Sequence, residues 1–258
     1  MKGFHVLIPA RLESSRLPEK ALADLAGRPM IVRVYERACQ CGALSVHVAT
    51  DSEMIAEAVR AAGGRVIMTG SAHASGTSRL AEAAARLEFS DDDVVVNVQG
   101  DEPALPPACI DQVAALLSAN PGTGIATLWT TLESREQWLD PNVVKLVTDH
   151  SNHALYFSRA PIPARRDGGS PSGLDRDWPS GLARRHIGLY AYRVGALANW
   201  SALPSSALEA SEALEQLRAL EAGWRIVCAR AVETVPPGVD TADDLLAMRH
   251  RFAGCAPV

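Results

Sequence analysis

The chain has 258 residues, of which 47% are hydrophobic and 21% are charged, and its net charge at pH 7 is −5. This length and composition are typical of a globular α/β protein with a full core, and they exclude a disordered or collagen-like chain. The acidic balance argues against a nucleic-acid partner, because a protein that follows a phosphate backbone presents a broad basic surface.

The cysteines and the apolar runs both bear on the compartment. Five cysteines, at positions 39, 41, 109, 228 and 255, show no CxxC spacing, which predicts reduced thiols rather than a disulfide framework or a zinc site. We expect Cys39 and Cys41 to be buried. No apolar run reaches the roughly 18 residues of a membrane helix, and the chain opens directly on a strand. We therefore expect a cytoplasmic protein without membrane insertion.

The first predicted strand, Phe4 to Ile8, ends at Pro9 and leads into a basic loop. In an open α/β sheet ligands bind beyond the carboxyl ends of the strands, where Arg and Lys donors can surround a triphosphate. An ordinary solvated loop explains the same residues equally well. No GxGxxG or GxxxxGK(S/T) pattern occurs, so neither a dinucleotide oxidoreductase nor a P-loop ATPase is indicated. The candidate phosphate ligands in the loop are Arg11, Ser14, Ser15, Arg16 and Lys20.

The next segments alternate between helix and strand. We expect a helix from Pro29 to Gly42, a strand over 44–49, a helix from Asp51 or Ser52 to Ala62, and a strand over 65–68. With the first strand they form a βαβαβ pattern, which predicts a parallel sheet with right-handed crossovers.

The segment over 69–87 is a polar, glycine-containing loop that leads into an alanine-rich helix. Small residues at its start can bring free N–H groups close to a base or a ribose, and an Arg projects from the first helical turn. Simple helix capping by Ser75 or Thr77 is an equal alternative. The candidate ligands here are Ser75, Gly76, Thr77 and Arg79.

An apolar run over 94–98 is typical of a central parallel strand, and it ends in the segment QGDEP, residues 99–103. A carboxylate at the carboxyl end of such a strand is well placed to hold Mg²⁺, a hard cation that prefers oxygen ligands. We therefore predict Asp101 as a metal ligand. Turn formation before Pro103 is the alternative explanation.

From residue 124 the strands follow one another without full helices between them. We expect strands over 125–129, 143–148, 154–157 and 187–193, which form a mixed extension of the sheet that closes over a second substrate. A loop over 164–185 is either a lid or an insertion. The segment 207–224 favours a single helix, which Gly223 stops. A strand over 225–229 then precedes a last helix. Asp240 or Thr241 caps that helix, with Asp244 completing a capping box around Thr241.

Several segments between residues 4 and 249 resemble the 3-deoxy-D-manno-octulosonate (Kdo) cytidylyltransferase family, and more loosely the CMP-sialic acid synthetases. They are IPARLESSRLPEKALADLAGRPMI, SGTSRLAE, NVQGDEP, YFSRAPIP, RRHIGLYAYR, LEQLR and GVDTADDL. Ser78 stands where the family usually has an acid, and Glu19 stands where a glycine is common. The resemblance implies a Rossmann-like three-layer nucleotidyltransferase fold of the nucleotide-diphospho-sugar transferase type. Its central sheet is mostly parallel, with a smaller mixed β extension.

The resemblance also implies one domain, 1–258, with a nucleotide-binding part over about 1–123, a sugar-acid and dimerisation part over 124–200, and closing helices over 201–258. The implied enzyme is a Mg²⁺-dependent cytidylyltransferase that acts in lipopolysaccharide synthesis and forms a homodimer. It converts CTP and Kdo into CMP-Kdo and pyrophosphate.

The resemblance assigns site residues in three groups. Those implied to take part in catalysis are Arg11, Lys20, Asp101 and Asp240, of which Asp101 and Asp240 hold the metal. Those implied to bind CTP are Arg11, Ser14, Arg16, Lys20, Ser75, Gly76, Thr77, Arg79 and Gln99. Those implied to bind Kdo are Arg159, His186, Tyr190, Glu215 and Gln216; taken alone, Tyr190 fits a core position as well as a pocket.

Two other functions fit parts of the sequence. A CMP-sialic acid synthetase or another sugar-nucleotide pyrophosphorylase would share the first loop but should differ at YFSRA and LEQLR. A non-catalytic nucleotide sensor could keep the loop but would not need both Asp101 and Asp240.

Overall fold

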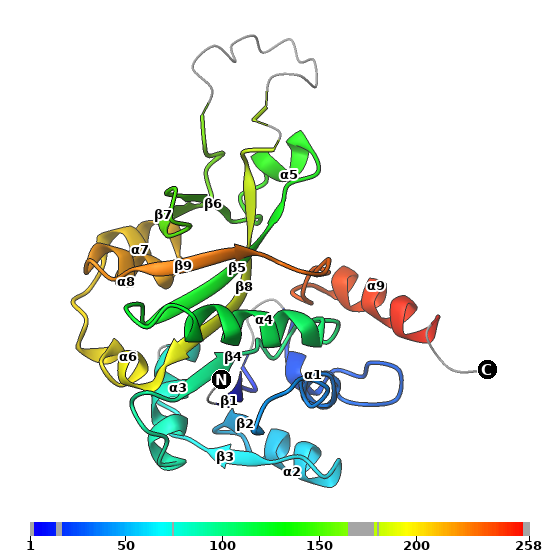
Figure 1. Ribbon diagram of the computed structural model, residues 1–258. Coiled ribbons are helices and arrows are strands. Elements are labelled where there is room, and N and C mark those ends of the chain that lie inside the picture. The colour runs from blue at the N-terminus through cyan, green and yellow to red at the C-terminus, as the bar shows by residue number, and fades with distance from the viewer. Residues whose placement is uncertain (1–2, 14–16, 74, 165–177, 180, 255–258) are drawn as a thin grey trace.

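The computed structural model describes residues 3–13, 17–73, 75–164, 178–179 and 181–254. In this part of the chain a nine-stranded sheet lies between two layers of helices (Figure 1). The α/β class and the mostly parallel sheet with added antiparallel strands are confirmed. The predicted lid over 164–185 falls largely outside the described residues, as do Ser14 and Arg16.

The sheet has the strand order β3-β2-β1-β4-β8-β5-β9. Strands β1 to β4 are mutually parallel, β8 is antiparallel to both β4 and β5, and β9 is parallel to β5. The short strand β6 pairs with β7 and with the start of β8. The bounds are β1 Phe4–Ala10, β2 Ser45–Thr50, β3 Val66–Met68, β4 Val94–Asn97, β5 Ile125–Thr131, β6 Lys145–Thr148, β7 Ala154–Ser158, β8 Arg184–Arg193 and β9 Ile226–Arg230.

The helices cover both faces of the sheet. Apolar side chains of α1, α2, α4 and α9 pack into one buried cluster, and those of α3, α6 and α8 pack into a second. The α-helix bounds are α1 Met30–Ala38, α2 Glu53–Ala61, α3 Gly76–Arg86, α4 Pro107–Ser118, α5 Arg135–Leu139, α6 Val194–Ala198, α7 Ala207–Glu212, α8 Gln216–Glu221 and α9 Ala242–Ala253, and the 3-10 turns are η1 Lys20–Leu22 and η2 Trp200–Ala202.

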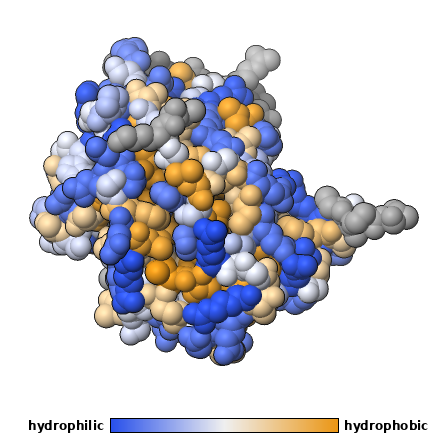
Figure 2. All heavy atoms as spheres, turned by 60° about the horizontal axis from the view of Figure 1, so that its bottom comes forward, coloured by the Kyte–Doolittle hydropathy of each residue, from blue (hydrophilic) through white to orange (hydrophobic). Residues whose placement is uncertain are grey.

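The surface and the helix lengths agree with a globular domain. Figure 2 shows hydrophilic residues around the outline of one face and hydrophobic residues toward its middle, a mixture that is ordinary for folded proteins. No helix in the described ranges is both long enough and apolar enough to cross a membrane.

The prediction that Pro9 ends the first strand is wrong, because β1 continues to Ala10 and Pro9 pairs with Ala49 of β2. Leu7 directs its carbonyl toward β4, where it accepts from the Val98 N–H. Pro9 lies two residues after Leu7, so its backbone groups point to the same side of β1, toward β4. The pairing with β4, however, stops at Leu7. The N–H that proline lacks is therefore not needed there.

The prediction of one continuous helix over 207–224 is also wrong. Helix α7 ends at Glu212, Ala213 has a left-handed conformation with φ of 49°, and α8 begins at Gln216. The Arg159 side chain donates hydrogen bonds to the carbonyls of Glu212 and Ala213, which lie at the end of α7. Tertiary contacts thus override a strong local helix propensity.

Two smaller predictions also differ from the structure. The helix that begins after Pro29 ends at Ala38 rather than at Gly42. Cys39, just past its end, is exposed and Cys41 is half-buried, so neither is the buried residue that we expected. The four cysteines in the described ranges are free thiols, as predicted.

Candidate active site

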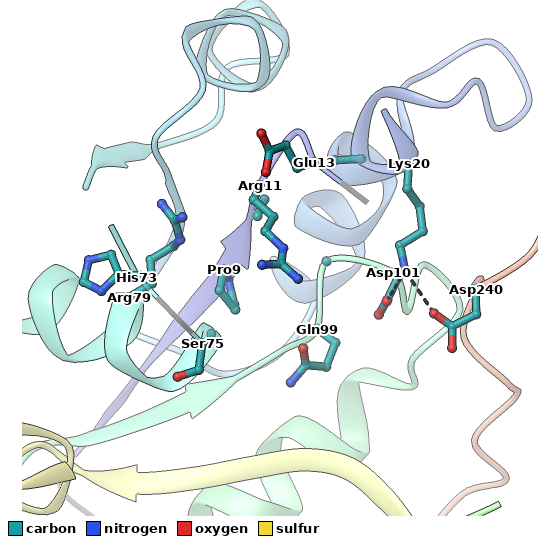
Figure 3. A pocket seen from close by; sticks show the side chains of 14 residues that line it. Pro9, Arg11, Glu13, Lys20, His73, Ser75, Arg79, Gln99, Asp101 and Asp240 are labelled. Carbon is teal, nitrogen blue, oxygen red and sulfur yellow. Dashed lines mark hydrogen bonds and ion pairs between the residues drawn. The ribbon is translucent and has the colours of Figure 1, made fainter. Parts of the chain in front are cut away.

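Two cavities meet at the carboxyl end of β4. The smaller one, of about 320 Å³, lies among the end of β1, the η1 turn, the start of α3 and the QGDEP segment (Figure 3). The larger one, of about 1000 Å³, continues toward β6, β8 and α8. Gln99, Asp101 and Asp240 border both cavities.

At this shared wall Lys20 bridges two carboxylates. Its Nζ lies 2.6 Å from Asp101 Oδ2 and 3.1 Å from Asp240 Oδ1, and the Lys20 side chain is 17% exposed. Burial alone would lower the pKa of Lys20, but the charges and hydrogen bonds of the two carboxylates outweigh it and raise that pKa. The Lys20 ammonium therefore stays protonated and positively charged at neutral pH.

Local backbone structure brings these three residues together. Lys20 opens the η1 turn directly after Glu19, whose φ of 52° is left-handed. The Val239 N–H donates to the Asp101 carbonyl at 2.9 Å, which ties the segment before α9 to the end of β4. A Cβ at Gly238 would lie 3.2 Å from the same carbonyl oxygen, so glycine permits this close approach.

The N-terminus of α3 forms the other side of the smaller cavity. Ser75 caps the helix by accepting from the Ser78 N–H at 3.2 Å, which confirms the alternative prediction that Ser75 acts as a helix cap. Its side chain also lines the smaller cavity. Arg79 is 4% exposed, and its guanidinium pairs with Asp51 Oδ2 at 3.2 Å and donates to Thr69. The charge of Arg79 is thus balanced within the protein, and its role toward a triphosphate stays a prediction.

Ser78, where the family usually has an acid, belongs to a compact polar network. Its Oγ donates to the Ser75 carbonyl at 3.0 Å and lies 3.1 Å from His73 Nδ1. The opposite ring nitrogen of His73 bonds to Glu82, which also accepts from the Gly70 N–H. The network fixes His73 in the wall of the smaller cavity.

The residues predicted to bind the sugar acid line the larger cavity, with one addition. The five are Arg159, His186, Tyr190, Glu215 and Gln216. Thr77, which the resemblance places at CTP, lies in the wall of this cavity instead and donates to Glu215 Oε2 at 2.8 Å. Of the other residues predicted to bind CTP, Arg11, Lys20, Ser75, Gly76, Arg79 and Gln99 line the smaller cavity.

His186 is a neutral side chain in the cavity wall, because burial lowers its pKa to about 3. Its Nε2 lies 3.0 Å from Thr127 Oγ1, and that hydroxyl lies 2.9 Å from the Leu189 carbonyl. When the Thr127 hydroxyl gives its one hydrogen to that carbonyl, Nε2 carries the ring proton and Nδ1 is an acceptor. The ring is therefore suited to a hydroxyl donor rather than to a carboxylate.

Arg159 holds the backbone around the larger cavity. Its guanidinium donates to the carbonyls of Glu212 at 2.6 Å, Pro141 at 2.9 Å and Ala213 at 3.4 Å. These bonds use three of the five N–H groups of an arginine, so among its described contacts two remain for a ligand. Arg159 is therefore both a structural clamp and a cavity residue.

Two residues of the larger cavity, Glu102 and Asn97, were not predicted from the sequence. Glu102 follows Asp101 directly, and burial and the negative charge of Asp101 raise its pKa to about 8, against the opposing charge of Arg185. Its position one residue after the predicted metal ligand was an available signal. Asn97, 3% exposed, also lines the larger cavity, but nothing in an apolar strand sequence distinguishes it from a core polar residue.

Comparisons with known proteins identify the family of this chain. A family model described as cytidylyltransferase matches residues 5–226. A curated relative from Hahella chejuensis, named 3-deoxy-manno-octulosonate cytidylyltransferase, is 51% identical over 255 residues, which are 98% of this chain and 99% of the relative. A relative of the same name from Saccharophagus degradans is 51% identical over 251 residues, with 97% and 98% covered.

A solved structure gives the same result for the fold. The structure of CMP:2-keto-3-deoxy-manno-octonic acid synthetase complexed with CTP matches with a TM-score of 0.88 at 39% identity, over 99% of this chain and 100% of that chain. The family model ends at residue 226, before Asp240, whereas the two curated relatives cover 98% and 97% of the chain. This chain belongs to the cytidylyltransferase family.

Proposed function

We infer that this protein is a nucleotidyltransferase that joins CTP to Kdo and releases CMP-Kdo and pyrophosphate. The observation that supports this best is the wall shared by the two cavities. Gln99, Asp101 and Asp240 border both of them, so substrates held in each would meet at the same carboxylates. Bringing two reactants together in a fixed orientation is the main contribution a protein makes to such a transfer.

The smaller cavity suits the nucleotide. Arg11 and Lys20 line it and bring positive charge to the triphosphate, and Ser75 and Gly76 lie at the N-terminus of α3, where helix N–H groups favour anions. Lys20 would lie near the phosphoryl group that is transferred. Its raised pKa keeps it charged for this role.

The larger cavity suits an acid that carries several hydroxyls. Three buried oxygens there have no partner among the described residues: Asn97 Oδ1, Glu102 Oε2 and Glu215 Oε1. Unpaired buried polar atoms are costly, and hydroxyls of a ligand, which both donate and accept, would satisfy them. Arg159 would meet the carboxylate with its remaining N–H groups, and His186 Nδ1 would accept from a hydroxyl.

The reaction forms one bond and breaks one. The anomeric oxygen of Kdo attacks the α-phosphorus of CTP, and the bond from that phosphorus to the oxygen of the leaving pyrophosphate breaks in line. The hydroxyl proton passes to solvent as the new bond forms. The side chains of this protein orient the two substrates and balance the charge that develops, with Lys20 and Arg11 at the phosphates.

The carboxylate ligands at the wall shared by the two cavities fit Mg²⁺. Carboxylate oxygens of Asp101 and Asp240 converge on one cation, the Lys20 ammonium, so the two side chains already point to a common position. No group of three or more His, Cys, Asp or Glu side chains with metal-binding geometry occurs in the described ranges, which leaves further positions to phosphate and water, as is usual for Mg²⁺. When bound, the ion would supply positive charge and lower the pKa of the attacking hydroxyl.

We also propose that the enzyme is a cytoplasmic homodimer that serves lipopolysaccharide synthesis. Large apolar side chains such as Leu155 on β7 and Leu182 are 61% and 69% exposed, and a second copy of the chain would cover such surface. Sedimentation velocity at several concentrations tests the dimer, and a single monomeric species would refute it.

The reaction is tested by measuring pyrophosphate release with CTP and Mg²⁺, with Kdo, with N-acetylneuraminate and with no acceptor, and by identifying the product by mass. We expect release with Kdo and a product of the mass of CMP-Kdo. Release with N-acetylneuraminate alone would keep the reaction type and refute the acceptor. No release with either acceptor would refute the enzymatic function.

A further inference from the structure

Lys145 is a buried cation that the proposed chemistry does not use. It lies on β6 and is 0% exposed, and no ion pair with a carboxylate involves it among the residues that the structure describes. Its Nζ donates to the backbone carbonyls of Asp140 at 2.8 Å and Arg159 at 2.6 Å. Burying an ammonium is expensive, and an apolar residue of similar size would usually stabilise the fold as well or better.

The two carbonyls belong to segments that border the larger cavity. Asp140 follows α5 and Arg159 follows β7, and both residues line the cavity. One ammonium therefore fixes the separation of two wall segments that are 19 residues apart in sequence. The side chain of Leu146, the next residue of β6, packs instead in the apolar cluster with Phe157.

A second set of bonds continues from Arg159 to α7. The Glu212 carboxylate accepts from the Ser158 hydroxyl at 2.6 Å and from the Arg159 N–H at 2.8 Å. In return the Arg159 side chain donates to the carbonyls of Glu212 and Ala213 at the end of the helix. The end of β7 and the end of α7 are thus joined by reciprocal hydrogen bonds around two ionised side chains.

The break between α7 and α8 links these hydrogen bonds to the residues that face the ligand. Because Ala213 is left-handed, the chain changes direction after Glu212, and Glu215 reaches Thr77 on α3 while Gln216 enters the cavity wall. In a continuous helix Glu212, Glu215 and Gln216 would lie on the same helix face instead. The positions of Glu215 and Gln216 therefore depend on the bonds that hold Glu212 and Arg159.

We propose that Lys145 and Glu212 are positioning residues for the acceptor: together they hold Arg159 and the α7–α8 break in the arrangement that presents Arg159, Glu215 and Gln216 to the sugar acid. The inference rests on the proposed function, since it assumes that the larger cavity binds Kdo. Neither side chain has to touch the substrate, and neither contributes to the smaller cavity.

The test uses Lys145→Met, which keeps the side-chain stem and removes the ammonium. We expect KM for Kdo to rise about tenfold, the effect of losing one hydrogen bond to a charged group, with KM for CTP within about twofold of wild type. Leu146→Val is the matched control, because it removes a methylene from the same buried strand without touching either carbonyl. Both Michaelis constants should stay unchanged in that control.

Glu212→Gln provides a second test of the same proposal if the Lys145→Met variant does not fold. The amide matches the carboxylate in shape but turns an N–H donor toward the Ser158 or Arg159 donor, so we expect the same selective rise in KM for Kdo. A folded Lys145→Met or Glu212→Gln variant with an unchanged KM for Kdo would overturn the inference, as would an equal rise in both constants. Wild-type enzyme that fails to use Kdo would instead overturn the proposed function.

Discussion

Replacing Lys20 with methionine should tighten the binding of a divalent cation to the protein in the absence of nucleotide. In the structure the Lys20 ammonium lies between Asp101 and Asp240, at 2.6 Å and 3.1 Å from their oxygens. A cation that binds these carboxylates has to displace the ammonium or share them with it. The methionine variant removes that competition and changes the local charge from −1 to −2.

The size of the effect follows from Coulomb's law. A unit charge at roughly 5 Å from a divalent cation changes its energy by about 2 kcal/mol in water-like surroundings and by about 7 kcal/mol at an effective dielectric constant of 20. The side chains of Lys20, Asp101 and Asp240 are 17%, 31% and 46% exposed, which favours the lower figure. About 2 kcal/mol corresponds to roughly thirtyfold tighter binding.

The assay is titration with Mn²⁺, followed by the electron paramagnetic resonance signal of the free ion, without CTP or Kdo. Arg60→Met is a control for net charge, since Arg60 lies on α2 and pairs with the exposed Glu53. We expect tighter binding only in Lys20→Met, together with a large loss of turnover. Unchanged or weaker Mn²⁺ binding in Lys20→Met would show that the ammonium does not hold the position that the metal takes.

Three further predictions concern single residues. Glu19→Gly should raise the free energy of unfolding by about 1 kcal/mol in urea denaturation, because a left-handed residue other than glycine costs about that much. Asp240→Ala should lower turnover at least about a hundredfold while the melting temperature changes little. Burial lowers the pKa of His186 to about 3, so the unfolded chain takes up a proton first as the pH falls. The stability from the neutral ring is complete above pH 6.5, and between pH 7.5 and pH 5.5 wild type should lose about 1 kcal/mol more than His186→Gln in urea denaturation.

Each of these has a contrary outcome. A less stable Glu19→Gly variant would mean that the glutamate makes a compensating contact. Turnover near wild type in Asp240→Ala would remove Asp240 from the proposed metal site. Equal pH dependence of the unfolding free energy in wild type and His186→Gln would mean that the ring is protonated as easily in the folded protein as in the unfolded one.

Local features of the sequence predicted the first parallel strands and the starts of three helices, because these features act over a few residues. Ser52 and Ser75 cap α2 and α3, and Thr241 forms the expected capping box with Asp244 at the start of α9. The alternation of apolar runs with amphipathic segments up to residue 68 gave the parallel strands in their correct sequence order. These signals need no knowledge of distant neighbours.

The break at Ala213 could not be predicted in this way, because its cause lies 54 residues away. The local sequence around Ala213 is rich in alanine, leucine and glutamate and favours a continuous helix. The bonds from Arg159 to the carbonyls at the end of α7 reverse that preference. Likewise, Pro9 remains in β1 only because its neighbouring strand has already ended on that side.

The pairing of Asp101 with Asp240 shows most clearly where reasoning from residue types stops. Each aspartate alone has a local explanation, a turn before Pro103 or a cap for α9, and Thr241 in fact provides that cap. Their convergence comes from a backbone hydrogen bond, Val239 N–H to the Asp101 carbonyl, and from the absence of a side chain at Gly238. The segment before α9 can therefore lie directly against the end of β4. A site built from such backbone contacts becomes visible only when the two segments are placed in space.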